Sequence, residues 1–316
     1  MVYGQNSVSK DTLLMGSYFS VTAVHENEEI AKTSIKNCFE EVIRIEKLIS
    51  SWNPASQTSK INAQAGLKPV QVDFELFSLI ERSVFLSSLT EGAFDISFAS
   101  IAKVWDFKKK YEVLPDSAKV KNSVGLINYQ WISLNKADTS VFLQKKGMKI
   151  GFGAVGKGYA ADRCKEILKS NNIHSGVINA GGDLTVFGEK PNGDLWNVGI
   201  TDPRNQKKFI TSVALKDQGI VTSGNYERFI EIKGKKYGHI VDPKSGWPVQ
   251  GLTSVTVIAQ TSEFADALAT TVFVMGKNKG LRFINKLNGV ECILVDEKHR
   301  IFKSENIELI PIENEK

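Results

Sequence analysis

Between residues 131 and 215 the chain consists of short segments of β-branched and aromatic residues separated by turn residues. Only one stretch in this region, residues 158–169, has the apolar spacing of a helix. Because parallel strands need a long crossover between one strand and the next, the pattern predicts largely antiparallel sheets. The expected strands are residues 131–134, 141–143, 148–150, 177–179, 184–187, 196–200 and 209–215.

Helical patterns lie on both sides of this region. The expected helices are residues 28–49, 74–89, 263–275 and 277–287. The other expected features are a strand at 17–25, a polar stretch at 50–65, a hairpin around Gly234-Lys235, a strand at 254–259 and two closing strands. This order predicts an α+β fold in which helices flank largely antiparallel sheets. A chain of 316 residues is near the upper limit for one core, so we expect two interlocked lobes.

Composition limits the classes of partner. Lys and Arg total 40 against 35 for Asp and Glu, and the only basic run is residues 108–110, so nucleic acid is not an expected partner. The cysteines Cys38, Cys164 and Cys292 are odd in number and far apart in sequence, which favours core packing over a disulfide framework. No apolar run approaches the ~20 residues that cross a bilayer.

A glycine-rich turn lies between an expected strand and a helix. Residues 151–158 match the dinucleotide pattern Gly-x-Gly-x-x-Gly and nearly match a P-loop. The P-loop interpretation fails because Gly158 occupies the position that needs Ser or Thr, and few β-α units support a dinucleotide fold. Both motifs nevertheless share an arrangement that binds anions. Backbone amides, a helix N-terminus and Lys157 all favour a phosphate here. A structural turn with a solvated Lys157 is equally open.

Asp266 and Thr270 are four residues apart in an otherwise apolar helical pattern, so both oxygens project from one helix face. A carboxylate in such surroundings needs compensation, which a hard cation such as Mg²⁺ would supply. The alternative is that Asp266 accepts backbone N–H groups at the helix start and Thr270 bonds its own helix. From this segment alone, the alternative is favoured.

His239 directly precedes an Asp-Pro-x-x-Gly turn, so it lies at the end of an expected strand. A histidine there can face a ligand and act as a general base near neutral pH. The alternative is an imidazole that only bonds a turn carbonyl.

Taken together, the segments of the chain resemble the ApbE family, the FAD:protein FMN transferases, in order and spacing over nearly the whole length. The matching segments are Met15-Gly16-Ser17 and residues 51–56, 92–95, 105–107, 153–158, 179–183, 222–226, 239–246 and 265–270. The resemblance implies Mg²⁺-dependent transfer of FMN from FAD to a threonine of an acceptor flavoprotein, such as a subunit of a membrane redox pump, with release of AMP.

The resemblance also implies roles for particular residues. The carbonyl of Ala154, the Asp266 carboxylate and the Thr270 hydroxyl would be the magnesium ligands, Lys157 would hold the pyrophosphate, and His239 would be the base. FAD would lie along Met15, Gly16, Ser17, Trp52, Ala93, Phe94, Asp95 and the backbone near Val241. Trp52 would cover a planar ring from an exposed loop, and its alternative role is that of a partly buried packing residue.

Two features depart from the family. Where its members commonly have Asp-Leu-Gly, this chain has Gly151-Phe152-Gly153, so one carboxylate of the usual site is missing. Members usually work outside the cytoplasm, often anchored by a lipid. We therefore expect a periplasmic or outer-face location, an export segment in the natural protein, residues 1–14 as a tail and residues 15–312 as one flavin transferase domain.

Three other functions remain as alternatives. An FAD pyrophosphatase would use the same site with water in place of the threonine hydroxyl. A non-catalytic flavin-binding protein would be consistent with the missing carboxylate at Gly151. A dehydrogenase rests on the glycine pattern alone.

Overall fold

An antiparallel sheet of eight strands forms the centre of the computed structural model, which describes residues 6–226 and 228–311. Every neighbouring pair of strands in this sheet is antiparallel, which confirms the pairing expected from the sequence. Its strands, in spatial order, are β1 (Asn6–Leu14), β2 (Ser17–His25), β6 (Ser175–Ala180), β7 (Asp183–Phe187), β10 (Gln218–Gly224), β13 (Leu252–Ala259), β14 (Glu291–Asp296) and β15 (Ile301–Lys303).

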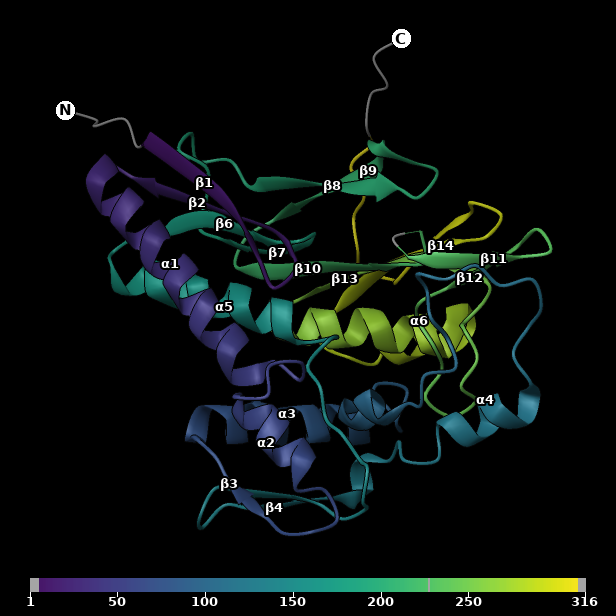
Figure 1. Ribbon diagram of the computed structural model, residues 1–316. Helices are drawn as coiled ribbons and strands as arrows, with labels where there is room; N and C mark the ends of the chain where they lie inside the picture. The colour runs from purple at the N-terminus through teal and green to yellow at the C-terminus, as the bar shows by residue number, and fades with distance from the viewer. Residues whose placement is uncertain (1–5, 227, 312–316) are drawn as a thin grey trace.

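Three helices, α1 (Glu28–Ile49), α5 (Gly156–Ser170) and α6 (Ser262–Ile284), cover one face of the sheet (Figure 1). The helix α1 begins at Asn27, whose side chain accepts hydrogen bonds from two amides of the first turn. Its buried residues recur at three- and four-residue intervals, so one stripe of the helix packs into the core. Within the described residues, no helix is both long enough and apolar enough to cross a membrane.

The opposite face of the sheet is covered by a hairpin made of β8 (Trp196–Asp202) and β9 (Asn205–Leu215) (Figure 1). A small core that includes Val213 of the hairpin and Ile220 of the sheet joins the two layers. The sheet therefore lies between helices and a hairpin.

A second lobe lies beyond the helices, on the side away from the sheet (Figure 1). Its elements are α2 (Gln57–Ala63), β3 (Val70–Gln71), α3 (Phe74–Leu89), η1 (Ile96–Ser100), α4 (Ser117–Ser123), η2 (Tyr129–Trp131), β4 (Ile132–Asn135) and β5 (Ser140–Leu143). The chain enters this lobe after α1 and leaves it before α5. A further hairpin, β11 (Phe229–Ile232) and β12 (Lys235–Gly238), follows β10.

Charged side chains tie the lobe to the helix layer. Arg82 of α3 makes a two-pronged ion pair with Glu263 at the start of α6, at 2.7 and 2.9 Å. Glu75 of α3 pairs with Arg44 of α1 at 2.8 Å and accepts a hydrogen bond from the Tyr159 hydroxyl of α5 at 2.6 Å. These contacts join two lobes that the chain itself crosses twice, as the expected α+β architecture of interlocked lobes requires.

Two expectations from the sequence differ from the structure. Residues 148–150 are not a strand, because side chains rather than a neighbouring strand bond their backbone: Asn62 bonds both the amide and the carbonyl of Ile150, and Ser100 does the same for Lys149. The expected N-terminal tail is also wrong over residues 6–14, which form β1 at the edge of the sheet. Residues 1–5 and 312 lie outside the described part of the chain.

Other expectations are confirmed closely. The predicted helices at 28–49 and 74–89 match α1 and α3, and α5 extends the predicted 158–169 by a few residues. The two helices predicted at 263–275 and 277–287 form one element, α6, that breaks at Gly276, where φ is 71°. The polar stretch at 50–65 contains the short helix α2, which begins at Ser56. Cys38 and Cys164, distant in sequence, are buried thiols that contact across α1 and α5.

Candidate active site

The site is organised by the contact between the starts of α5 and α6. A Cβ at Gly158 would lie 2.2 Å from the carbonyl oxygen of Ser262, so only glycine allows this approach. This contact also explains why no Ser or Thr can stand at the P-loop position. Asp162, one turn further along α5, accepts hydrogen bonds from the amides of Ser262 and Glu263 at 3.0 and 2.8 Å and so fixes the start of α6.

Asp266 follows one turn into α6 and is 5% exposed. Its Oδ2 accepts the amide of Gly158 at 3.4 Å, a group of the neighbouring helix rather than of its own. Burial, together with the charge of Asp183, raises the pKa of Asp266 well above the usual carboxyl value. A buried carboxylate in such a state gains most from a cation that binds it directly.

Thr270 lies one further turn along α6, and its hydroxyl is 3.4 Å from the Ser223 hydroxyl at the end of β10. The neighbouring Thr271 behaves differently, since its hydroxyl donates to the carbonyl of Ala267 in its own helix. The alternative in which Thr270 only bonds its own helix therefore fits Thr271 instead. Ser223 has no role in the predictions above, although it lies in one of the matching segments.

Lys157 makes an ion pair with Asp183, at 2.5 Å between Nζ and Oδ2. The side chain of Lys157 is 29% exposed and that of Asp183 is 2% exposed, so the alternative of a solvated lysine does not hold. Sequence analysis missed Asp183 because a single Asp at a strand start carries no spacing signal. Asp183 could have been noticed because it belongs to the matching segment 179–183, to which the sequence analysis gave no role.

The oxygens around the α5 N-terminus fit a hard cation. Asp266 offers a carboxylate, Thr270 a hydroxyl, and Ala154 a main-chain carbonyl in the turn just before α5, and Mg²⁺ prefers oxygen ligands of these kinds. In the described part of the chain, no group of three or more His, Cys, Asp or Glu could hold a metal. A magnesium site here would therefore rest on mixed oxygen ligands.

His239 follows directly after β12, at the strand end predicted for it. Its Nδ1 lies 3.3 Å from the carbonyl oxygen of Arg228, and because a carbonyl only accepts, this bond places the proton on Nδ1 and the lone pair on Nε2. Burial is the main cause that lowers the pKa of His239, and the positive charges of Arg228 and Lys157 add to it. The imidazole is thus a neutral base, and it lies close enough to Lys157 for the lysine charge to lower its pKa.

The loop that follows His239 is held by an aromatic cluster. Trp105 Nε1 donates to the carbonyl of Gly246 at 2.8 Å, and its ring contacts Tyr237 and Trp247 at centroid distances of 6.2 and 5.4 Å. The amide of Gly246 donates to the carbonyl of Asp242, which closes the predicted turn. These contacts give the 105–107 segment a structural role in positioning His239. Val241 is buried in the same cluster, so only its backbone is available to a ligand.

Met15 and Gly16 form the two-residue turn between β1 and β2, with φ of 51° and 69°. A positive φ is unusual for methionine, and such backbone strain is concentrated at functional sites. A Cβ at Gly156 would lie 3.7 Å from Met15 Cε, so the Met15 side chain rests on the first turn of α5. A Cβ at Gly181 would contact both Ser17, at 2.6 Å, and Lys157, at 3.9 Å, so this turn lies beside the ion pair.

The remaining residues expected to bind FAD lie in the second lobe. Trp52 is 87% exposed, so it is not a partly buried packing residue. Ala93 and Phe94 are buried, and both oxygens of Asp95 accept hydrogen bonds, from Ser97 and from the amide of Tyr129. The Asp95 carboxylate therefore holds the backbone at the start of η1 in place.

Contacts at the glycines link these segments to the rest of the site. A Cβ at Gly92 would lie 3.9 Å from Asp95 and from Lys244. A Cβ at Gly151 would lie 3.7 Å from Ser51, the residue before Trp52. The expected FAD residues thus border the glycine turn on one side and the 239–246 loop on the other. The structure brings together the segments that the sequence placed in one site.

A model of the ApbE family matches residues 15–294 of the chain. An FAD:protein FMN transferase of Klebsiella pneumoniae is 32% identical over 298 residues, which cover 94% of this chain and 91% of that protein. Another, of Treponema pallidum, is 33% identical and covers 83% of this chain and 76% of that protein.

Solved structures of ApbE proteins are similar to this chain in fold. The crystal structure of the ApbE protein of Thermotoga maritima has a TM-score of 0.85 at 32% identity and covers 95% of this chain and 97% of that one. The apo form of the flavinyl transferase ApbE of Pseudomonas stutzeri has a TM-score of 0.84 at 24% identity, over 96% of both chains, which is a likeness of fold.

Proposed function

The chain belongs to the ApbE family and is a transferase, and from this premise we propose that it moves FMN from FAD onto a threonine hydroxyl of an acceptor flavoprotein. The reaction forms a phosphoester bond, releases AMP and depends on Mg²⁺. The names of the relatives support flavin transfer. The magnesium, the threonine and the AMP are the parts that this proposal adds.

One observation carries the proposal. The buried Asp266 carboxylate lies against the start of α5, next to the Lys157–Asp183 ion pair, with the Thr270 hydroxyl one turn further on. Phosphoryl transfer at a pyrophosphate requires mainly positioning and neutralisation of phosphate charge. A helix N-terminus, a lysine and an oxygen-lined cation site supply both.

Each residue has a separate role in this proposal. Asp266, Thr270 and the Ala154 carbonyl would hold Mg²⁺, and the metal would neutralise charge on the pyrophosphate. Lys157 and the amides at the start of α5 orient the phosphates. Asp183 positions the Lys157 ammonium through their ion pair.

The chemical step is a displacement at phosphorus. The threonine oxygen forms a bond to the phosphorus on the FMN side, the bond from that phosphorus to the bridging oxygen breaks, and AMP leaves with the bridging oxygen. His239 accepts the hydroxyl proton on Nε2, since Nδ1 is engaged with the Arg228 carbonyl. Its lowered pKa keeps it neutral, and so able to accept a proton, at pH 7.

FAD lies along Met15, Gly16 and Ser17, the segment 93–95 and the backbone near Val241, with the exposed Trp52 as a face for its planar ring. As part of the same proposal, the protein acts in the periplasm or on the outer face of the inner membrane, anchored by a lipid. The family resemblance supports this location, and fractionation of cells that produce the natural protein tests it.

The experiment is incubation with FAD, Mg²⁺ and a flavoprotein domain that bears a target threonine, followed by mass spectrometry of the domain with and without chelator. A mass increase of one FMN that chelator abolishes supports the transferase. An unmodified domain with AMP and FMN in solution would instead establish a pyrophosphatase. Bound FAD without any turnover would establish a binding protein.

A further inference from the structure

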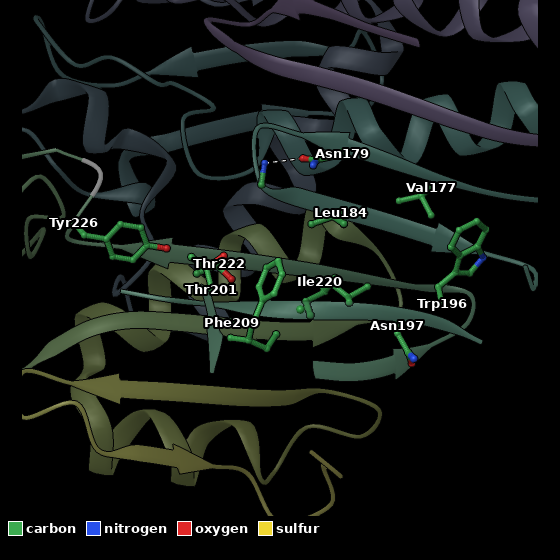
Figure 2. Close-up of a pocket in the computed structure, with 14 residues that line it drawn as sticks. Val177, Asn179, Leu184, Trp196, Asn197, Thr201, Phe209, Ile220, Thr222 and Tyr226 are labelled. Atoms are coloured by element: carbon green, nitrogen blue, oxygen red, sulfur yellow. Dashed lines mark hydrogen bonds between the residues drawn. The ribbon is translucent and has the colours of Figure 1, made fainter. Parts of the chain in front are cut away.

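A cavity of about 390 Å³ lies between the hairpin β8–β9 and the sheet, on the face opposite the helices. We call this cavity the hairpin channel. Strands β6, β7 and β10 form its floor and the hairpin forms its roof, as Figure 2 shows. Trp196 lies at one end of the view and Tyr226 at the other, so the channel runs along the strands.

The Tyr226 end of the channel adjoins the catalytic residues. Gly182, which lines the channel, directly precedes Asp183, and Thr222, which also lines it, directly precedes Ser223. Asp183 pairs with Lys157 and Ser223 contacts Thr270, so two strand ends carry the channel on one face and the catalytic groups on the other. A ligand in the channel therefore ends beside the proposed reaction centre.

The turn between β6 and β7 is exposed at the end of the sheet. Its two glycines have positive φ, and a Cβ at Gly182 would meet no atom within 4 Å. The side chain of Asn179 holds this turn by accepting the amide of Gly182 at 2.8 Å. Open space above Gly182 allows a side chain from the channel to reach past the end of the sheet.

The walls of the channel suit a stretch of polypeptide. Val177, Leu184 and Ile220 make its middle apolar, whereas Asn179 and Thr222 make the end near the site polar. At the far end, the partly buried indole ring of Trp196 offers a flat apolar wall to a bound segment.

Phe209 completes the roof and is 53% exposed. A Cβ at Gly199 on the adjacent strand would lie 2.6 Å from the Phe209 ring, so the ring rests directly on the Gly199 backbone. Gly199 thus lets a large aromatic surface lie across the roof of the channel. Exposed aromatic side chains in such positions are typical anchors of protein contacts.

In the proposed function, FAD lies along the 15–17 turn and the 93–95 segment, outside the hairpin channel. The channel is therefore available to the second substrate. We propose that the hairpin channel binds the extended segment of the acceptor flavoprotein that carries the target threonine. The segment lies along the strands, packs against the Trp196 ring and passes its threonine over Gly182 to the phosphorus. This inference rests on the proposed function and names where its protein substrate binds.

Kinetics of transfer to a threonine-bearing flavoprotein domain test the channel. Phe209→Ala removes part of the roof and Val177→Phe narrows the floor, and each should raise the KM for the domain about tenfold or more. The affinity for FAD, followed by flavin fluorescence, should stay within about twofold because FAD binds elsewhere. Phe85→Ala, which removes an exposed phenylalanine of α3 far from the channel in sequence, should change neither quantity.

A second measurement separates this proposal from the proposed function. The photoreactive residue p-benzoylphenylalanine, placed at position 209 or at position 85, reports binding of the domain whether or not transfer occurs. Crosslinking to the domain from 209 but not from 85 supports the channel, even where no FMN is transferred and the proposed function fails. Transfer without crosslinking from 209, with unchanged KM in both variants, overturns the channel and leaves the function standing. Crosslinking to a second copy of this chain, or loss of FAD affinity in Val177→Phe, also overturns it.

Discussion

The carboxylate of Asp162 on α5 accepts the backbone amide of Glu263 on α6 at 2.8 Å, and this bond holds together the two helices that carry Lys157 and Asp266. Asp162 is partly buried, and it also bonds the amide of Ser262 and the hydroxyl of Thr185. Asp266 lies in α6 about one helical turn after the two amides that Asp162 binds. The geometry of the proposed metal site therefore depends on a residue outside it.

Replacing Asp162 with Ala should lower the free energy of unfolding by about 1–2 kcal/mol, because two amides at the start of a buried helix lose their acceptor. It should also raise the Mg²⁺ concentration for half-maximal activity, because α6 shifts relative to α5. Urea unfolding and magnesium titration of activity measure the two effects.

Thr261→Ala is the matched control for this variant. The Thr261 side chain caps the same helix through the amide of Phe264, at 3.2 Å, but it does not bond α5. It should reduce stability and leave the magnesium requirement unchanged. An equal magnesium shift in both variants would show that any weakening of the helix start suffices.

Replacing Asp266 with Asn should abolish magnesium-dependent transfer, by roughly a thousandfold or more, because the metal loses its only carboxylate ligand among those proposed. Without metal the variant should be at least as stable as the wild type, since burial raises the pKa of Asp266 and an amide avoids that penalty. Thermal unfolding with chelator and with Mg²⁺ measures this. The wild type should gain stability from Mg²⁺ and the variant should not, and wild-type rates in Asp266→Asn would remove the metal assignment.

Replacing His239 with Asn should leave FAD binding intact and slow single-turnover transfer about 10²-fold or more at pH 7.5. In the wild type, the base form is the neutral imidazole, and burial holds its pKa below the usual 6.5. The rate should therefore stay level as pH falls from 8 to about 6.5 and drop only below that. A profile that is the same in both proteins would exclude His239 as the base.

Periodicity predicted the long elements well because one buried stripe decides them, as in α1 and α3. It failed at residues 148–150, where the apolar side chains are buried as in a strand but Asn62 and Ser100 replace the partner strand. It also missed β1, an edge strand whose exposed and mostly polar residues give little period-two signal. Local patterns record burial, whereas these cases depend on distant hydrogen-bond partners.

The candidate site also contains residues that local sequence patterns mark and residues that only the fold brings together. Asp266, Thr270, Lys157 and His239 were candidates from the sequence because helix spacing, a glycine turn or a rare residue marked them. Asp183 was not assigned a role, since its partner Lys157 is distant in sequence and only the fold pairs them. The hairpin channel could not be predicted at all, because its walls come from five strands.

The contact between the two lobes should depend on pH through Glu75. Arg44 is the main cause that lowers the pKa of Glu75 below its usual 4.5. A carboxylate with a lowered pKa stabilises the folded state above pH 4.5, and this contribution disappears as pH falls through the lowered value. Arg44→Met should therefore lower the free energy of unfolding at pH 7 by about 1 kcal/mol, since Arg44 is 46% exposed and solvent screens the pair.

The difference between wild type and Arg44→Met in urea unfolding should shrink steadily from pH 5 to pH 3. Lys136→Met provides the control, because its ion pair with Glu81 is largely exposed and should contribute little at any pH. A difference that stays constant with pH would mean that Arg44 acts through packing of its aliphatic part rather than through charge.

The Lys157–Asp183 pair allows catalysis to be separated from stability. Lys157→Met removes the ammonium beside a nearly inaccessible carboxylate and should lower the free energy of unfolding by about 3 kcal/mol. Asp183→Asn in the same chain should restore much of that loss, because the uncompensated charge is gone. Transfer should stay low in the double variant, because the phosphates still lack the lysine. Urea unfolding and single-turnover transfer on all four proteins complete the cycle. Recovery of transfer together with stability would show that Lys157 supports the fold alone and does not hold the pyrophosphate.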